Sequence, residues 1–159
     1  MRWIILVAII VFVVSQIIHL RPSKRDQQLQ ALRKAATRAG FVVRFWTLRN
    51  SGYDHRQLPE SGFMYLLPRQ SRHVANSNAW ALWISANGEM LNIGGHPPDL
   101  ARQCLTAFRE RFPDAWALLE CSDAGLGLLW QERGEPDDVQ NIADALDLLR
   151  KNLDALPNK

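Results

Sequence analysis

Residues 78–83 read NAWALW, and residues 114–119 read DAWALL. Each of these apolar runs precedes a turn signal, a second short apolar run, a loop rich in glycine or proline, and a Pro-Asp pair that can open a helix. Both stretches therefore predict a strand, a turn, a second strand and a helix, over 78–112 and 114–156. Because the match is short, duplication of one supersecondary unit and chance similarity between two hairpin-helix units both remain open. The expected architecture is the same in either case.

The spacing of apolar residues after each hairpin supports the two helices. Residues 98–112 place apolar side chains on one side, and Pro113 ends this helix. Residues 137–156 carry apolar side chains at steps of three and four, and Arg150 and Lys151 near the end suit the helix dipole. A coiled coil is the alternative for this last helix, but the pattern covers too few heptads to favour it. We expect each helix to cover a sheet.

Two further strands are predicted upstream of the hairpins. Residues 41–48 and 63–67 are apolar and rich in β-branched and aromatic side chains. The interval between them, NSGYDHRQLPESG at 50–62, is polar and rich in turn formers, which predicts a mobile surface loop, and 68–78 predicts a second loop. The sequence therefore predicts an α+β domain over 41–159, with an antiparallel sheet and helices packed mainly on one face.

Four tryptophans fall on the predicted hairpins, namely Trp80, Trp83, Trp116 and Trp130. Trp80 and Trp83 are an odd number of residues apart, so their side chains point to opposite faces of one strand. One interpretation buries these rings in the core, as is usual for large aromatic side chains. The other interpretation leaves an exposed aromatic patch that binds a protein partner.

The N-terminal stretch from Trp3 to Leu20, WIILVAIIVFVVSQIIHL, contains no formally charged side chain. As a helix it reaches roughly 27 Å, close to the hydrocarbon thickness of a bilayer. A cleaved signal peptide is the alternative, but a small-x-small cleavage site is missing. A core helix of a soluble protein would instead show a polar face. We therefore predict a retained single-pass transmembrane anchor and stop over 1–22.

Basic residues cluster after the predicted anchor: Arg21, Lys24, Arg25, Arg33, Lys34 and Arg38. Only Arg2 and the terminal amine precede the anchor. The positive-inside rule therefore places the C-terminal domain in the cytoplasm. An inverted topology, with the domain facing the cell envelope, is the alternative. The same cluster predicts contact with the anionic headgroups of membrane lipids.

Residues 23–40 predict a basic amphipathic helix beside the membrane. Ser23 suits the N-cap, Asp26 the third helical position of a capping box, and Gly40 the left-handed residue that ends the helix. The apolar stripe comprises Leu29, Leu32, Ala36 and Ala39. One face of the helix is therefore expected to dock on the domain while the other faces lipid or water.

The start of the chain resembles the YajC family, small accessory subunits of the bacterial preprotein translocase. The resemblance rests on the anchor followed by Arg21, Pro22, Lys24, Arg25, Gln27, Gln28, Leu29 and Leu32. It covers about the first quarter of the chain and implies a single-pass topology in the bacterial inner membrane. The Gly-Asp and Thr-Gly-Gly pattern of the family does not follow Gly40, so the resemblance implies neither the fold of the domain nor a translocase function.

The net charge of +3 is unevenly distributed. Lys and Arg outnumber acidic residues eight to one over 2–44, whereas acidic residues outnumber them fifteen to eleven over the remainder. Lipid accounts for the basic segment, so we do not expect nucleic acid as a partner. The sequence does not indicate an oligomeric state.

Motifs for catalysis are missing: the sequence contains no nucleophile elbow, P-loop, HExxH or dinucleotide fingerprint. Cys104 and Cys121 lie in apolar patterns without ligand spacing, which predicts small buried residues, no metal and no cofactor. The closest approach to a site is the loop with His96 and Asp99, which leads to a helix N-terminus that can receive an anion. A plain strand-to-helix connection explains the same residues.

The sequence as a whole predicts a membrane-anchored, non-enzymatic protein whose cytoplasmic domain binds a protein partner at the membrane. The anchor, the basic helix, the acidic domain and the missing catalytic motifs all favour this function. The alternative is a membrane-anchored enzyme, or a domain facing the envelope, with a site near His96 and Asp99.

Overall fold

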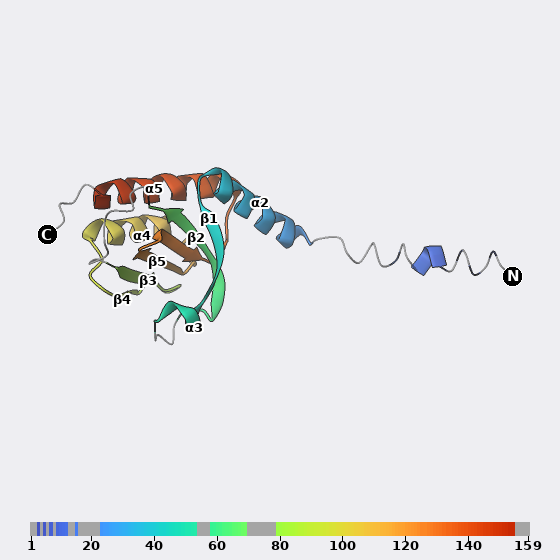
Figure 1. Cartoon of the computed structure of the whole chain (residues 1–159), viewed down its shortest axis with the longest axis horizontal. Helices are drawn as coiled ribbons and strands as arrows, with labels where there is room; N and C mark the ends of the chain where they lie inside the picture. Colours follow the sequence, from blue (N-terminus) through green and yellow to red (C-terminus); the bar gives the residue numbers. More distant parts are fainter. Residues whose placement is uncertain are drawn as a thin grey trace. The chain divides into compact units, whose positions relative to one another are not determined.

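The computed structural model describes residues 23–53, 58–69 and 79–154, together with positions 3, 5, 7, 9–12 and 15. These residues form an α+β fold with a six-stranded antiparallel sheet (Figure 1), which confirms the predicted class. The elements are α2 (Lys24–Arg38), β1 (Val42–Thr47), α3 (Leu48–Ser51), β2 (Ser61–Pro68), β3 (Trp80–Ile84), β4 (Met90–Gly94), α4 (Asp99–Arg111), β5 (Ala117–Ser122), β6 (Gly125–Trp130) and α5 (Pro136–Asp154).

The strands lie in the order β1-β2-β6-β5-β3-β4, and every neighbouring pair is antiparallel. Hairpin β3–β4 is followed by α4, and hairpin β5–β6 is followed by α5. The predicted order of strand, turn, strand and helix therefore occurs twice. The hairpins join through β3 and β5, where Leu82 lies opposite Leu119.

The two matching sequence runs are not equivalent in their packing. Trp80 belongs to the larger of two apolar clusters, whereas its counterpart Trp116 packs against the smaller cluster on the other face. Because side chains alternate along a strand, a shift of one residue reverses the face on which each of them lies. The order of strand, turn, strand and helix is repeated, but the origin of the two units by duplication stays a prediction.

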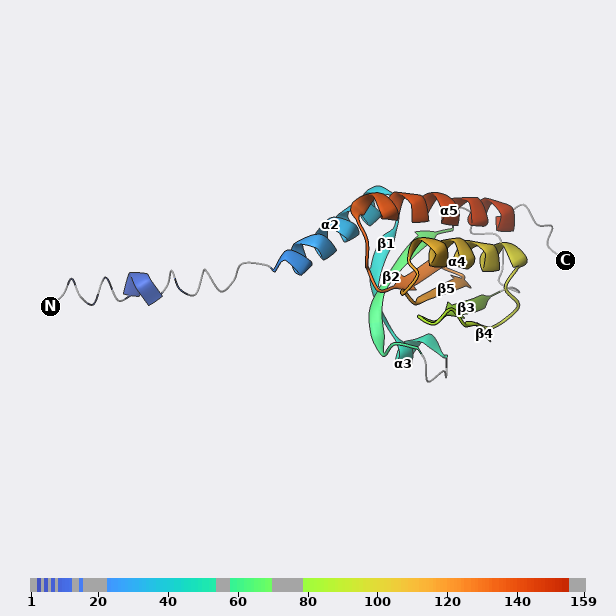
Figure 2. The same ribbon diagram turned by 180° about the vertical axis from the view of Figure 1, so that it is seen from behind.

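The larger apolar cluster lies between the sheet and the helices α2, α4 and α5. Figures 1 and 2 show α4 and α5 beside each other on the same side of the sheet. The helices contribute buried residues from each of the predicted apolar stripes: Leu32 and Ala36 from α2, Ala101, Leu105 and Phe108 from α4, and Val139, Ile142, Leu146 and Leu149 from α5. The prediction of helices packed mainly on one face is therefore confirmed.

The smaller apolar cluster occupies the opposite face of the sheet, and its buried members are Trp46, Leu58, Met64, Ala81, Trp83, Leu118 and Leu129. The interval 50–62 helps to cover this face. Ser51 ends the short helix α3, Tyr53 packs against the cluster, and Leu58 is only 6% exposed. The described part of this interval is therefore not wholly at the surface, because Leu58 is buried and Tyr53 is half-buried against the sheet. Residues 54–57 lie outside the described part.

Helix α2 begins and ends as predicted. The Asp26 N–H donates to Ser23 Oγ at 3.1 Å, and the Ser23 N–H donates to Asp26 Oδ2 at 3.1 Å, which completes the capping box. The Ser23 hydroxyl also donates to Asp26 Oδ2 at 2.7 Å, and this bond, together with the one from the Ser23 N–H, holds the pKa of Asp26 below its usual range. Gly40 has φ +91° and follows the helix, where the Phe41 N–H donates to the Ala36 carbonyl at 2.9 Å.

An ion pair fastens α2 to the rest of the domain. Arg33 donates from Nε and Nη2 to the two carboxylate oxygens of Glu132 at 2.8 and 2.7 Å, and its guanidinium lies 3.6 Å from the centre of the Phe63 ring. The Tyr65 hydroxyl donates to the same carboxylate at 2.8 Å. Arg33 was expected at the lipid surface, but its guanidinium is bound within the domain because Glu132 accepts both of its hydrogen bonds.

The predicted anchor falls mostly outside the described residues. Within the part of the chain that is described, no helix is both long enough and apolar enough to cross a membrane. The described positions from Trp3 to Ser15 are helical, and the four consecutive side chains Ile9, Ile10, Val11 and Phe12 are 54–65% exposed.

Candidate functional site

Glu120 is a buried acidic residue in the middle of the sheet. It lies on β5, opposite Ala81 of β3 and Gly127 of β6, and is 6% exposed. A Cβ at Gly127 would lie 3.2 Å from Cγ of Glu120 and 2.7 Å from Sδ of Met64. The glycine therefore provides the room that the glutamate side chain needs on the face opposite the helices.

Two residues from distant parts of the chain reach this carboxyl group. Nη2 of Arg44, on β1, lies 3.2 Å from Oε1 of Glu120, and the Tyr53 hydroxyl lies 3.4 Å from Oε2. Since β2 and β6 separate β1 from β5, the Arg44 and Glu120 side chains meet across two strands. Ser122 lies close by, and its buried hydroxyl makes no hydrogen bond within the described residues.

Burial has the largest effect on the pKa of the Glu120 carboxyl group. It raises the pKa of Glu120 above its ordinary value, and the positive charge of Arg44 and the hydrogen bond from Tyr53 oppose the shift. Burial and the neighbouring Glu120 also raise the pKa of Tyr53 to about 12. The Tyr53 hydroxyl is therefore neutral at physiological pH and serves as a hydrogen-bond donor rather than as a base.

These side chains border a pocket of about 360 Å³ next to the edge strand β1. Its lining combines four consecutive residues of β1 with polar groups from α3, from the segment after α3 and from β5: Arg44, Phe45, Trp46, Thr47, Ser51, Tyr53, Glu120 and Ser122. The pocket offers hydrogen-bond donors and acceptors beside an aromatic wall. This combination suits recognition of a side chain that enters along β1.

We expect Glu120→Gln to change how stability depends on pH. A carboxyl group whose pKa is raised by folding binds a proton more tightly in the folded state, so its contribution to the free energy of unfolding falls as pH rises above its ordinary value of 4.5. Wild type should therefore lose stability relative to Glu120→Gln over that range. Urea unfolding at pH values from about 4 to about 8 measures the free energy of unfolding of wild type minus that of Glu120→Gln. If this difference stayed constant or rose with pH, the raised pKa of Glu120 would be contradicted.

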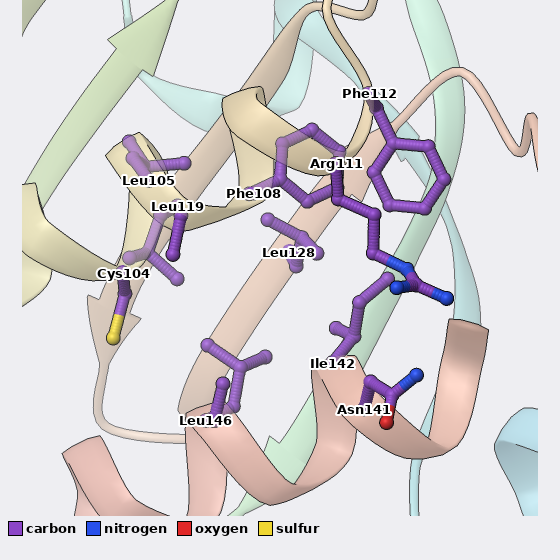
Figure 3. Close-up of a pocket in the computed structure, with 12 residues that line it drawn as sticks. Cys104, Leu105, Phe108, Arg111, Phe112, Leu119, Leu128, Asn141, Ile142 and Leu146 are labelled. Atoms are coloured by element: carbon purple, nitrogen blue, oxygen red, sulfur yellow. The ribbon is translucent and has the colours of Figure 1, made fainter. Parts of the chain in front are cut away.

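A second pocket, of about 200 Å³, lies between α4 and α5 over the sheet (Figure 3). Its walls are almost entirely apolar and include Leu105 and Phe108 of α4, Leu119 and Leu128 of the sheet, and Ile142 and Leu146 of α5. Figure 3 shows Arg111 extending from α4 towards α5 at one end, with Cys104 at the other. This pocket suits the binding of an apolar ligand rather than the catalysis of a reaction.

Most of the tryptophans proposed for partner binding belong to the core. Trp80, Trp83 and Trp130 are 2–3% exposed, and only Trp116 is half-buried, with its ring centre 5.3 Å from that of Trp83. The rings of Trp80 and Trp130 lie in the larger cluster and that of Trp83 in the smaller one. The core interpretation accounts for these three residues, so they do not form a surface patch.

His96 and Asp99 are both exposed on the connection from β4 to α4. Gly95 has φ +60°, and a Cβ there would lie 2.0 Å from the Ala79 carbonyl oxygen, so this glycine is needed to turn the chain into the connection. No described acidic, basic or nucleophilic side chain is hydrogen-bonded to His96 or Asp99. The structure therefore does not bring them together with the Glu120 pocket.

We expect the double substitution His96→Ala and Asp99→Ala to leave partner binding and stability unchanged, to within about 0.5 kcal/mol, because both side chains are exposed. Urea unfolding and partner capture measure the two properties. Loss of an activity with the fold intact would instead support the enzymatic alternative.

The basic residues proposed to contact lipid do not form one uniform surface. Lys24, Arg25, Lys34 and Arg38 are exposed on α2, whereas Arg33 is bound to Glu132. Arg21 lies outside the described residues. Four of the six residues therefore keep side chains at the surface of α2.

Neither metal nor similarity to another protein identifies the function. Among the described residues, no group of three or more His, Cys, Asp or Glu side chains could hold a metal ion. Cys104 is half-buried, Cys121 is buried, and neither forms a disulfide bond. No protein-family model, curated protein or solved structure matches this chain.

Sequence reasoning missed the Glu120 pocket, although a signal was available. Glu120 interrupts the apolar strand ALLECS, and Arg44 interrupts VVRFWT. A single charged residue within a strand that is otherwise apolar on both faces indicates either an exposed position or a buried, paired charge. The pairing partner, however, lies 76 residues away and is given only by the strand order.

Proposed function

We propose that this protein is a single-pass, membrane-anchored and non-enzymatic binding protein whose cytoplasmic domain binds an extended segment of a protein partner along β1. One observation carries the proposal, namely an open edge strand that borders a polar pocket. In this type of recognition, hydrogen bonds between main chains give affinity, and pockets for alternate side chains give specificity.

The edge formed by β1 has properties that favour pairing with another strand. β1 is six residues long, contains neither proline nor a bulge against β2, and pairs only with β2 among the described strands. Val42 and Phe45 are 51% and 63% exposed, and Arg44 is the only charged residue of the strand. A regular, exposed and mostly apolar edge of this kind is a template for another chain.

The opposite edge of the sheet is less suited to pairing. β4 is shorter, and its register against β3 shifts between Ala81 and Leu82. Bulges of this kind twist an edge and hinder the addition of another strand. The comparison favours β1 as the site where a partner binds.

The described helical positions near the N-terminus favour the proposed membrane anchor. Ile9, Ile10, Val11 and Phe12 are consecutive and exposed, so together they point to nearly all sides of a helix. The Ser15 hydroxyl donates to the Phe12 carbonyl at 2.7 Å, which satisfies the one described polar side chain of this stretch. A helix that is apolar on all sides is typical of surroundings made of lipid.

The basic residues after the anchor favour a cytoplasmic domain at the bacterial inner membrane, the topology implied by the resemblance to the YajC family. Exposed Lys24, Arg25, Lys34 and Arg38 provide the positive charge that anionic headgroups attract. A reporter fused after Lys159 tests the orientation. The proposal expects activity only of a reporter that works in the cytoplasm, and activity only on the outer side would contradict it.

Photocrosslinking tests partner binding at the edge. A photoreactive residue at Phe45 is compared in intact membranes with the same residue at Leu148 of α5, which is similarly exposed at 59%. We expect a specific protein adduct from position 45 that is absent from position 148. Val42→Lys should abolish this adduct, because a lysine on an edge strand opposes pairing. Identical adducts from both positions, or an adduct insensitive to Val42→Lys, would contradict the proposal.

A further inference from the structure

The pocket between α4 and α5 is an unusual feature of a small domain. Protein interiors are closely packed and leave few spaces larger than a water molecule. An apolar cavity of roughly 150 Å³ is known to hold a small hydrocarbon ligand. The space here measures about 200 Å³ and is lined almost wholly by apolar side chains. It is therefore large enough for part of a hydrocarbon chain and too small for a helix.

The two ends of the pocket differ in polarity. Arg111 and Asn141 border one end, while Cys104 lies at the other (Figure 3). Burial raises the pKa of the Cys104 thiol, so that end carries no charge at neutral pH. Arg111 donates from Nε and Nη2 to Oδ1 of Asp138, and its Nη1 makes no hydrogen bond within the described residues.

Asp138 holds the guanidinium in position. Its second oxygen, Oδ2, accepts the Glu135 N–H at 2.8 Å, which ties this carboxylate to the start of α5. Arg111 is consequently oriented while its side chain stays 53% exposed. Planar guanidinium groups with unused N–H donors bind carboxylates in water-accessible sites.

We propose that this pocket binds a single-chain amphiphile with a carboxylate head, such as a fatty acid, with its hydrocarbon chain between α4 and α5 and its carboxylate at Nη1 of Arg111. The inference is independent of the proposed partner site, because the pocket lies on the helix-covered face of the sheet whereas Glu120 lies on the other. It gives the domain a second ligand of a different chemical class.

The rim of the pocket allows a test that spares the core. Ala107 of α4 and Ala145 of α5 both border the pocket and are both exposed. A phenylalanine at either position would cover the opening without replacing a buried side chain. Thr106→Phe is the matched control, since Thr106 is exposed on α4 and does not border the pocket.

The experiment uses the full chain in nanodiscs of an uncharged phospholipid, with methyl NMR of Leu105, Leu128 and Leu146 during titration with sodium octanoate. We expect saturable shifts of these methyl groups and none of Leu91 on the other face. Ala145→Phe and Ala107→Phe should weaken octanoate binding at least about tenfold, while Thr106→Phe should bind as wild type does. The proposal would be overturned if the pocket methyl groups did not shift, or if the Ala145→Phe and Ala107→Phe variants bound octanoate as tightly as wild type does.

Octan-1-ol tests the role of the carboxylate, because it has the same chain length without the charge. We expect octan-1-ol to bind about tenfold more weakly than octanoate in wild type, and Arg111→Gln to remove this preference. Arg111→Lys should retain part of it, since the positive charge remains. Equal affinities of the two compounds in wild type would refute the carboxylate part of the proposal.

Discussion

Gly125→Ala is expected to destabilise the domain by on the order of 4 kcal/mol. Gly125 begins β6 and has φ +138°, a conformation that side chains with a Cβ rarely adopt. A Cβ there would lie 2.1 Å from the Leu67 carbonyl oxygen and 3.1 Å from the Arg69 nitrogen. These are main-chain atoms of β2 and of the residue after it, so the clash is relieved only by separating two strands inside the sheet.

Gly40→Ala is the control for this substitution, because Gly40 also has a positive φ, +91°, but a Cβ there would meet no atom within 4 Å. Its cost should be about 1 kcal/mol, from backbone strain alone. Urea unfolding of the full chain in a mild detergent, followed by tryptophan fluorescence, gives both values. Equal costs for Gly125→Ala and Gly40→Ala would show that the close approach of β2 and β6 does not limit position 125.

Glu132→Ala is expected to destabilise the domain by on the order of 3 kcal/mol, because it removes the shared acceptor of Arg33 and Tyr65. The Tyr65 side chain is 1% exposed, so its hydroxyl would be left buried without this partner. Arg33 can partly return to water, since its side chain is 31% exposed. That exposure keeps the expected cost at the lower end of the range for a broken buried ion pair.

Glu135→Ala is the matched control, since Glu135 precedes α5 in the same connection and is exposed. It should change the free energy of unfolding by no more than about 0.5 kcal/mol. Hydrogen exchange adds a second readout for Glu132→Ala. If the ion pair fastens α2, the amides of residues 31–38 should exchange faster relative to those of α4. An unchanged exchange rate in α2 would mean that Leu32 and Ala36 hold the helix without Glu132.

Local sequence signals predicted the elements of the fold well. The cap at Ser23, the turn at Gly40 and the apolar stripe of α5 each depend on residues a few positions apart, so their physical basis is visible in the sequence. The hairpins were recognisable because each turn lies between two short apolar runs. The sequence did not indicate the face of the sheet on which Trp116 packs. A shift of one residue in strand register reverses that face, and the sequence run alone does not specify the register.

The candidate site could not be assembled from the sequence for a different reason. Glu120 and Arg44 are 76 residues apart, and Arg33 and Glu132 are 99 residues apart. The contact between Arg44 and Glu120 depends on the strand order, which places β2 and β6 between β1 and β5, and the contact between Arg33 and Glu132 depends on α2 lying near the end of β6. Tyr53 and Leu58 were assigned to a loop because the polar residues around them dominate the local pattern.

Amide hydrogen exchange of β1 tests the central claim most directly. The full chain in membranes is compared with and without the protein that crosslinks to position 45, and β4 at the other edge of the sheet provides the internal reference. We predict that outward-facing amides of Val42–Thr47 exchange at least about tenfold more slowly with the partner, while those of Met90–Gly94 do not change. Unchanged exchange along β1, or slower exchange only along β4, would contradict the proposal that a partner strand pairs with β1.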